Sequence, residues 1–191
     1  MEKLAVKVAA HRLMQGGVIA YPTEAVWGLG CDPQNEEACL ELLQIKQRPI
    51  QKGMILIAGQ IGDFEEILAA LSPGQYKKLD VAWQQQGKTG AVTFLVPDVL
   101  DQIPFWIKGS HRAVALRVSH HPVVRSLCKE FGGPIVSTSA NITGKLPARS
   151  RVLVEKYFGS QLNFVVPGQL GGARNPSKIV DFSTGQLVRA S

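Results

Sequence analysis

Short, continuously apolar segments alternate with segments of helical period along this chain, and this alternation restricts its possible folds most strongly. The apolar runs lie at residues 18–21, 54–57, 91–96, 113–118, 134–136, 164–166 and 178–180. Helices are predicted at residues 4–13, 36–46, from 72 onwards, 122–131 and 151–158. Strands that are buried on both faces read as unbroken apolar runs. The pattern therefore predicts an α/β protein whose sheet is covered by helices on both faces, with substantial parallel pairing.

Capping residues mark several of the predicted helix ends. Asn35 is suited to an N-cap, and two glutamates follow it in the first turn, where the helix dipole favours acidic side chains. Ser72 precedes Pro73 and Gln75, which is the order of a capping box with proline in the first helical position. No linker-like segment interrupts the elements. Residues 1–191 are therefore predicted to form a single domain, a length that buries roughly 70% of the unfolded surface.

The charge balance points to negatively charged ligands. The chain has 21 Lys and Arg residues against 15 Asp and Glu, a formal net charge of +6 at pH 7. Such a surplus favours nucleotides or RNA as partners where the charges cluster. The three cysteines (Cys31, Cys39 and Cys128) are too few and too scattered for a disulfide framework or a zinc site, so reduced thiols are predicted. The N-terminal segment lacks the apolar run of a signal peptide and no membrane span is present, so a cytoplasmic location is expected.

Two common nucleotide-binding motifs fail on this sequence. Residues 87–89, Gly-Lys-Thr, have the ending of a P-loop, but Ala82 stands where the motif requires glycine. Gly28 and Gly30 begin a dinucleotide-binding fingerprint that continues to Pro33 where glycine is needed. If ATP binds to this chain, it must therefore bind in a different kind of cradle.

Familiar catalytic constellations are missing from the sequence as well. His120 and His121 are adjacent and have no carboxylate partner nearby, so they are interpreted as solvated residues at a helix start and not as metal ligands. The sequence offers no Ser-His-Asp or Cys-His arrangement, and no covalent nucleophile is expected.

Two polar clusters lie where predicted elements end. In the Tyr-Pro-Thr-Glu segment after the first apolar run, Thr23 and Glu24 can face a cleft, because ligands gather beyond strand ends in open α/β sheets. Alternatively, the Thr23 hydroxyl bonds the backbone of an ordinary strand-to-loop transition. Further on, Pro49 favours an extended Arg48, which would place Lys46 and Arg48 on one side to address a polyanion. A solvated basic loop is the alternative there.

Two loops later in the chain have ligand-binding composition. Residues 137–141, Ser-Thr-Ser-Ala-Asn, open a polar loop predicted to run to Ser150, and they can donate hydrogen bonds to phosphate without adding charge. A turn or cap rich in such residues is equally common. The glycine-rich residues 168–177 could close over a ligand, with Arg174 or Ser177 as the contact. Surface disorder is the alternative for this second loop.

Taken in order, these clusters resemble the YrdC-domain family, in particular its bacterial TsaC-type members. The resembling segments are VIAYPTEAVWGLGCDP at 18–33, LLQIKQRPIQKGMILIA at 42–58, GAVTFLVP at 90–97, AVALRVSHHP at 113–122, PIVSTSANITG at 134–144 and GGARNPSKIVD at 171–181. They span nearly the whole chain. The resemblance implies a YrdC-like fold, which is an open, twisted α/β sheet of mixed strand direction, flanked by helices and with a basic concave face.

The resemblance also implies a set of site residues. Contacts to ATP and its phosphates are expected from Lys46, Arg48, Thr93, Ser139, Asn141 and Ser177. Thr23 and Arg117 are expected to bind threonine and bicarbonate. No side chain is expected to bind a metal, and Mg²⁺ is expected to arrive with the nucleotide.

The implied activity is formation of L-threonylcarbamoyladenylate and pyrophosphate from L-threonine, bicarbonate and ATP. The product would serve threonylcarbamoyladenosine modification of tRNA next to the anticodon, through a downstream threonylcarbamoyl-transferase complex. Weak, non-specific binding of tRNA or double-stranded RNA fits the basic balance. One alternative is a non-catalytic module for structured RNA, although RRM, KH and double-stranded-RNA-binding signatures are missing. Another is a carbamoyl-phosphate-type or sugar-phosphate enzyme on the same fold.

Overall fold

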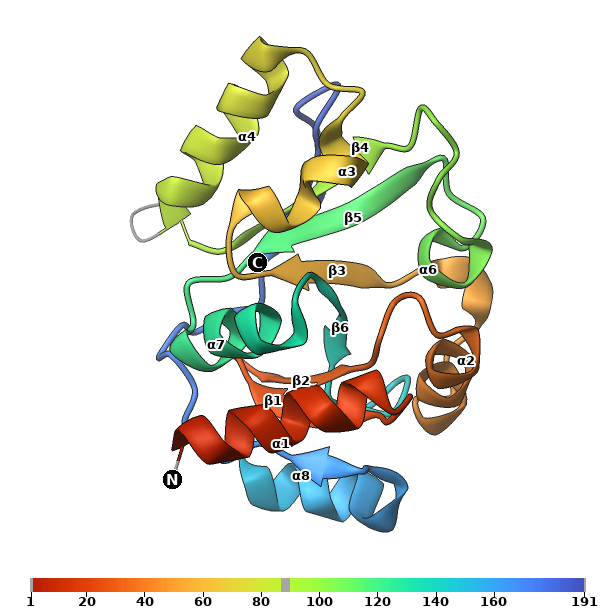
Figure 1. The fold of residues 1–191 in the computed structure, drawn as a ribbon, viewed down its shortest axis with the longest axis vertical. Helices are drawn as coiled ribbons and strands as arrows, with labels where there is room; N and C mark the ends of the chain where they lie inside the picture. Colours follow the sequence, from red (N-terminus) through yellow and green to blue (C-terminus); the bar gives the residue numbers. More distant parts are fainter. Residues whose placement is uncertain (1, 87–89, 191) are drawn as a thin grey trace.

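A computed structural model describes residues 2–86 and 90–190, and its strands form one sheet (Figure 1). The strands are β1 (Ile19–Pro22), β2 (Trp27–Gly30), β3 (Ile55–Ala58), β4 (Val92–Pro97), β5 (Ala113–Val118), β6 (Ile135–Ser139), β7 (Phe164–Val165), β8 (Lys178–Asp181) and β9 (Leu187–Arg189). Their order across the sheet is β7-β1-β2-β6-β3-β5-β4-β8-β9. The Gly-Lys-Thr segment at 87–89 lies outside the described residues.

The sheet has mixed strand direction, as the family resemblance implies. The pairs β1–β7, β3–β5 and β4–β8 are parallel, and the other neighbouring pairs are antiparallel. The prediction that β6 gives way to a loop at Ser137 is wrong. Thr138 and Ser139 continue the strand because β2, which the sequence patterns did not reveal, pairs with them. Their polar side chains are tolerated there because a ladder needs only backbone donors and acceptors.

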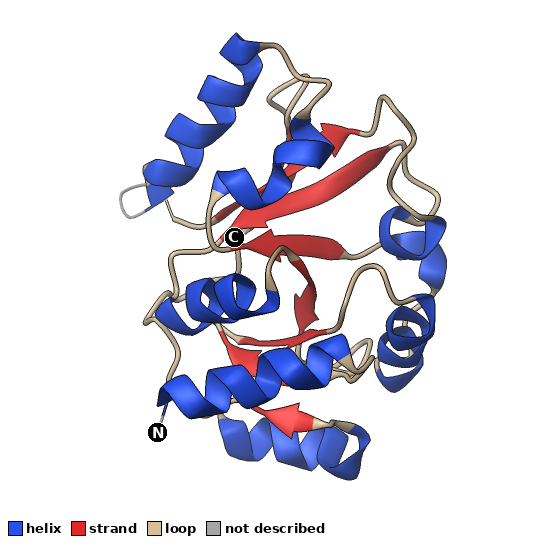
Figure 2. Ribbon diagram, viewed as in Figure 1, coloured by secondary structure: helices blue, strands red, loops and turns tan. Residues whose placement is uncertain are grey.

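Helices surround the strands (Figure 2). The α-helices are α1 (Glu2–Met14), α2 (Glu36–Ile45), α3 (Glu65–Leu68), α4 (Pro73–Gln84), α6 (Phe105–Lys108), α7 (Pro122–Phe131) and α8 (Arg151–Phe158), with 3₁₀ turns at Ile50–Lys52, Ile61–Phe64 and Gly159–Gln161. The predicted caps are present. The Asn35 side chain accepts a hydrogen bond from the Ala38 amide at 3.0 Å. Ser72 and Gln75 form a capping box. Within the described ranges, no helix is long and apolar enough to cross a membrane.

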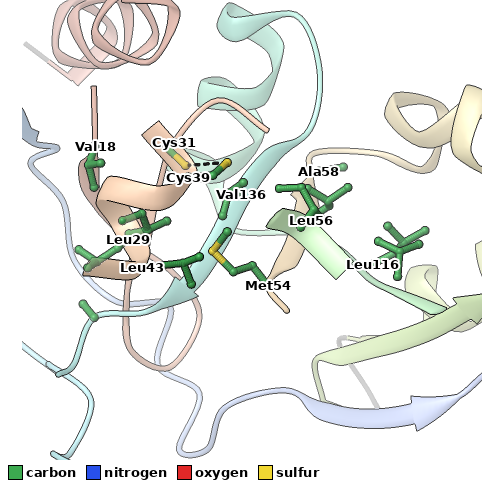
Figure 3. Close-up of a cluster of buried hydrophobic side chains, with 14 of the residues drawn as sticks. Val18, Leu29, Cys31, Cys39, Leu43, Met54, Leu56, Ala58, Leu116 and Val136 are labelled. Atoms are coloured by element: carbon green, nitrogen blue, oxygen red, sulfur yellow. Dashed lines mark hydrogen bonds between the residues drawn. The ribbon is translucent and has the colours of Figure 1, made fainter. Parts of the chain in front are cut away.

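Hydrophobic clusters cover both faces of the sheet, as the apolar strands predict. Neighbouring residues of a strand point to opposite faces. Ile57 joins a cluster under α1 and α7, which lie side by side (Figure 1). Leu56 and Ala58 join the second cluster, close to Cys39 and Leu43 of α2 (Figure 3). This cluster also contains side chains from α4 and α8. The α1–α7 layer covers only part of its face, and the remainder carries polar side chains.

Candidate active site

The register of the strands places polar residues on the face of the sheet that α1 and α7 cover only in part. Arg117 on β5 lies opposite Ile57 on β3, and the β4–β5 register places Thr93 opposite Arg117. On the other side of β3, Ile55 lies opposite Ser137 on β6. Paired residues share a face, so the three polar residues line one surface although they are far apart in sequence.

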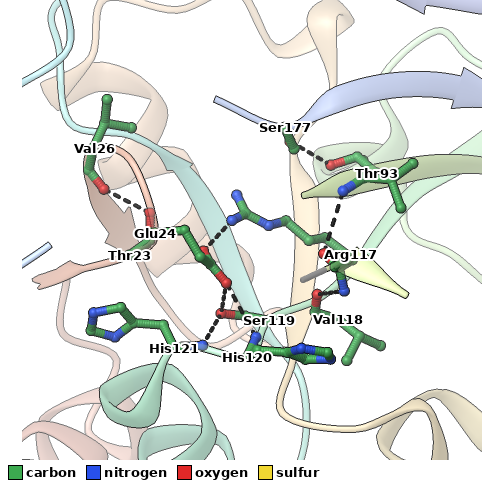
Figure 4. Close-up of polar contacts among 12 residues, drawn as sticks. Thr23, Glu24, Val26, Thr93, Arg117, Val118, Ser119, His120, His121 and Ser177 are labelled. Carbon is green, nitrogen blue, oxygen red and sulfur yellow. Dashed lines mark hydrogen bonds and ion pairs between the residues drawn. The ribbon is translucent and has the colours of Figure 1, made fainter. Parts of the chain in front are cut away.

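The Glu24 carboxylate and the Arg117 guanidinium form a nearly buried ion pair at this surface (Figure 4). Their side chains are 18% and 11% exposed. Glu24 also accepts hydrogen bonds from the Ser119 hydroxyl at 2.6 Å and the His120 amide at 3.1 Å. Burial alone would raise the pKa of Glu24, but Arg117 and Ser119 outweigh it and hold that pKa below its usual range. The Arg117 Nε is buried and has no hydrogen-bond partner in the described part of the chain, so the ion pair with Glu24 carries most of the compensation for burying this guanidinium.

Lys46 and Arg48 do not lie on an extended segment, which corrects the sequence prediction. Lys46 caps α2, and Gln47 has a left-handed φ of 51°. The Arg48 amide then reaches back to the Leu43 carbonyl at 2.9 Å, so the segment is a helix-ending turn. Arg48 donates to the Gly53 carbonyl at 2.8 Å, which holds the following loop.

The Lys46 ammonium group links this turn to the Ser-x-Asn segment. Its Nζ donates to the Ser139 carbonyl and, at 2.7 Å, to the Asn141 carbonyl. The Ser139 hydroxyl donates to Asn141 Oδ1 at 2.7 Å, and the Thr143 hydroxyl donates to the Lys46 carbonyl at 3.0 Å. Lys46 is 3% exposed, and burial, with the neighbouring Arg48 charge, lowers its pKa to about 7. These hydrogen bonds therefore hold the turn at Lys46 and the segment from Ser139 to Thr143 together.

Arg189, near the C-terminus, is a basic residue that the sequence analysis missed. Its guanidinium donates to the Ser177 carbonyl at 2.8 Å, and the Ser177 hydroxyl lies 2.8 Å from that of Thr93. Arg189 lies on an exposed strand, but its guanidinium contact is partly buried; this partial burial, with the charge of Arg117, lowers the pKa of Arg189. Burial and the Arg189 charge likewise lower the pKa of Arg48. The charge of Arg189 therefore acts on Arg48, and the charge of Arg117 acts on Arg189. No local pattern could have found Arg189, because the β8–β9 pairing places it there.

The glycine-rich loop is tied to the Thr23–Glu24 segment. The Gly171 amide donates to the Thr23 carbonyl at 3.0 Å and the Ala173 amide to the Glu24 carbonyl at 2.9 Å. Of the two candidate loop contacts, Ser177 is buried within the site, whereas Arg174 is exposed. The Thr23 hydroxyl donates to the Val26 carbonyl at 2.7 Å, so its donor serves the local turn and its oxygen can still accept.

The interpretation of the two histidines is half right. His120 is exposed, as expected. His121 stands at the start of α7 but is only 5% exposed, so it is not solvated. The Gly-rich loop covers it, and its ring lies against the Gln169 carbonyl. Neither histidine belongs to a metal-binding group, since residues 2–86 and 90–190 contain no cluster of three or more potential ligands.

Cations exceed anions on this face, so the arrangement can bind a polyanion. Lys46, Arg48 and Arg189 lack a carboxylate partner among the described ion pairs, and the Glu24 carboxylate is paired with Arg117. Nearby hydroxyl groups add neutral donors for phosphate or carboxylate oxygens. Fold and site together define an α/β protein with a group of basic residues on the open face of a mixed sheet.

Comparisons with known proteins narrow this class. The profile of the Sua5/YciO/YrdC family, described as "Telomere recombination", matches residues 11–191. The chain belongs to this family. A threonylcarbamoyl-AMP synthase of Marinobacter nauticus is 48% identical over 186 residues, which are 97% of this chain and 95% of the relative.

Solved structures agree with the fold. P. abyssi Sua5, crystallised in complex with L-threonine, superposes with a TM-score of 0.85 at 26% identity, covering 98% of this chain and 53% of Sua5. E. coli YciO superposes with a TM-score of 0.80 at 20% identity, covering 98% of this chain and 89% of YciO. The second likeness concerns the fold alone.

Proposed function

We propose that this chain is a threonylcarbamoyl-AMP synthase that forms L-threonylcarbamoyladenylate and pyrophosphate from L-threonine, bicarbonate and ATP. The observation that carries this function is the near-full-length similarity to synthases at about half identity. The cation-rich site supports it, because an adenylating enzyme must hold a triphosphate. The product would serve threonylcarbamoyladenosine modification of tRNA next to the anticodon.

In this reaction the threonine amine combines with bicarbonate or CO₂ to give a carbamate. A carbamate oxygen then bonds to the α-phosphorus of ATP, and the bond to the β-phosphate oxygen breaks to release pyrophosphate. Such a transfer requires alignment and charge stabilisation more than covalent catalysis. We assign the triphosphate to Arg48 and Arg189. Lys46 binds the Ser139 and Asn141 carbonyls and so positions these two residues to contact the nucleotide.

Threonine and its carbamate are assigned to the Glu24 side of the site. Thr23 contributes an acceptor oxygen, and Arg117 contributes its positive charge. Glu24 fixes the Arg117 side chain, so the guanidinium is already oriented before substrate arrives. Thr93 and Ser177 lie between this end and Arg189, where their paired hydroxyls can contact the reacting phosphate.

Among residues 2–86 and 90–190, no cluster of three or more His, Cys, Asp or Glu side chains could hold a metal ion. The one carboxylate of the site, Glu24, is committed to Arg117, Ser119 and His120. Mg²⁺ prefers octahedral oxygen ligands and readily keeps waters and phosphate oxygens, so we propose that it enters with the triphosphate. The downstream partner would be a threonylcarbamoyl-transferase complex. The free thiols of Cys31, Cys39 and Cys128 support action in the cytoplasm.

We expect pyrophosphate release to require threonine and bicarbonate together, because their adduct is the nucleophile. The assay contains protein, ATP and Mg²⁺, with each co-substrate omitted in turn, and the adenylate is identified by mass spectrometry. RNA should be unnecessary for turnover, and tRNA binding should be weak and fall steeply with salt. Full turnover without threonine or bicarbonate would overturn the assigned reaction. Tight, salt-tolerant RNA binding without turnover would favour the RNA-binding alternative.

Lys46 should take up a proton when ATP binds. With a pKa of about 7, the Lys46 side chain is uncharged in most molecules of the nucleotide-free protein at pH 8.5. A bound triphosphate favours the ammonium form and raises that pKa, so binding takes up protons and ATP affinity falls as the pH rises above 7. Calorimetry at pH 8.5 in two buffers of different ionisation enthalpy measures the uptake. Lys46→Arg stays charged and should abolish it, whereas buffer-independent heats in the unaltered protein would contradict the prediction.

A further inference from the structure

His121 is a buried histidine that the reaction scheme does not use. It is the N-cap residue of α7, yet its side chain makes no capping hydrogen bond. Its Nε2 lies 3.0 Å from the Gln169 carbonyl oxygen, in the first half of the 168–177 loop. A carbonyl only accepts, so Nε2 carries the proton. We propose that His121 is a positioning residue that latches the 168–177 loop over the threonine end of the site.

Packing alone does not account for a histidine here. With the proton on Nε2, the Nδ1 atom is an acceptor, and it is buried without a partner among the described residues. An unsatisfied buried polar atom is costly, so an apolar ring of similar shape would pack more favourably. Within residues 2–86 and 90–190, the one hydrogen bond of this ring is the bond to the Gln169 carbonyl of the loop.

The latch lies directly beside the residues assigned to threonine. The His121 amide donates to the Ser119 hydroxyl at 3.1 Å, and that hydroxyl donates to Glu24. A Cβ on Gly171 would lie 3.3 Å from the His121 ring and 3.1 Å from the Glu24 Cα, so the loop touches both.

Two backbone hydrogen bonds extend the contact from His121 into the site. The Gly171 and Ala173 amides donate to the carbonyls of Thr23 and Glu24. His121 holds Gln169, two residues before the first of these bonds. The two later loop attachments, Arg149 at the Ala173 and Arg174 carbonyls and Ser177 at Thr93, do not restrain Gln169 directly.

The loop position should therefore depend on the Nε2–H donor. Loss of one hydrogen bond of this kind weakens a local structure by about 2- to 10-fold in its closing equilibrium. For His121→Phe, we expect faster hydrogen exchange at the Gly171 and Ala173 amides by that factor. His121→Gln can present an amide N–H near the Nε2 position and should stay close to the unaltered protein. His120→Ala is the matched control, because that neighbouring ring is exposed.

The kinetic consequence rests on the proposed function. His121→Phe should raise the KM for threonine by about 2- to 10-fold, with little change in the KM for ATP or in kcat. The reason is that the latch adjoins Thr23 and Glu24 and not Arg48 and Arg189, which are assigned to the triphosphate. Unchanged exchange at both amides would overturn the latch, as would equal rises in the two KM values. If the unaltered protein forms no adenylate, the proposed function fails, but the exchange comparison of the three variants still tests the latch.

Discussion

Replacing Arg117 with methionine should lower the free energy of unfolding by about 3 kcal/mol, the low end of the range for breaking a buried ion pair. The change leaves the Glu24 carboxylate buried without its counter-charge. The low end applies because the Ser119 hydroxyl and the His120 amide still donate to that carboxylate. Urea unfolding at pH 7 measures the loss. Threonine-dependent adenylate formation should fall by about 10- to 150-fold, as expected for losing a charged hydrogen bond to substrate.

The double variant Arg117→Met with Glu24→Gln separates the two effects. Removing both charges should restore much of the lost stability, because no unpaired charge remains, while activity stays low. The pH dependence has a definite sign. The folded pKa of Glu24 lies below its ordinary 4.5, so the pair contributes stability above that value and loses it as pH falls through the folded pKa. An Arg117→Met protein as stable as the unaltered one would contradict the ion-pair account.

The sequence predicted the architecture well because apolar runs and caps are local signals. The helix at Arg151–Phe158 and the strand at Ala113–Val118 have the bounds that the pattern indicates. Strand β2 was not predicted, because Trp27–Gly30 contains two glycines and resembles a loop in sequence. Strand β9 is three exposed residues whose structure depends on pairing with β8.

The site was harder to predict, because its geometry depends on contacts between distant segments. A proline after Arg48 suggested extended backbone, but the capping turn of α2 fixes this segment through the Leu43 carbonyl. Lys46 could be recognised as basic, although nothing local shows that it is buried against Ser139 and Asn141. No pattern in the sequence marked Arg189 as a residue of the site. The assignments of these residues to ATP remain predictions, and Arg189 tests them most directly.

Arg189→Ala should weaken ATP binding by about 10- to 150-fold and leave threonine affinity nearly unchanged. The reason is that Arg189 repels Arg48 and is repelled by Arg117, and a bound triphosphate would relieve this repulsion. Calorimetric titration with ATP measures the loss. Arg151→Ala is the control, since that arginine forms an exposed ion pair with Glu155 on α8 and should change ATP affinity little.

Stability measurements distinguish a ligand-binding arginine from a structural one. Without nucleotide, Arg189→Ala removes like-charge repulsion and one hydrogen bond to the Ser177 carbonyl, two effects of opposite sign, so the free energy of unfolding should change by less than about 1 kcal/mol. With ATP at 100 times the dissociation constant of the unaltered protein, binding stabilises that protein by about 2.7 kcal/mol. A 100-fold weaker variant gains only about 0.4 kcal/mol at the same concentration. An Arg189→Ala protein that loses several kcal/mol without ATP but gains the full stabilisation with it would assign Arg189 to the fold and not to the nucleotide.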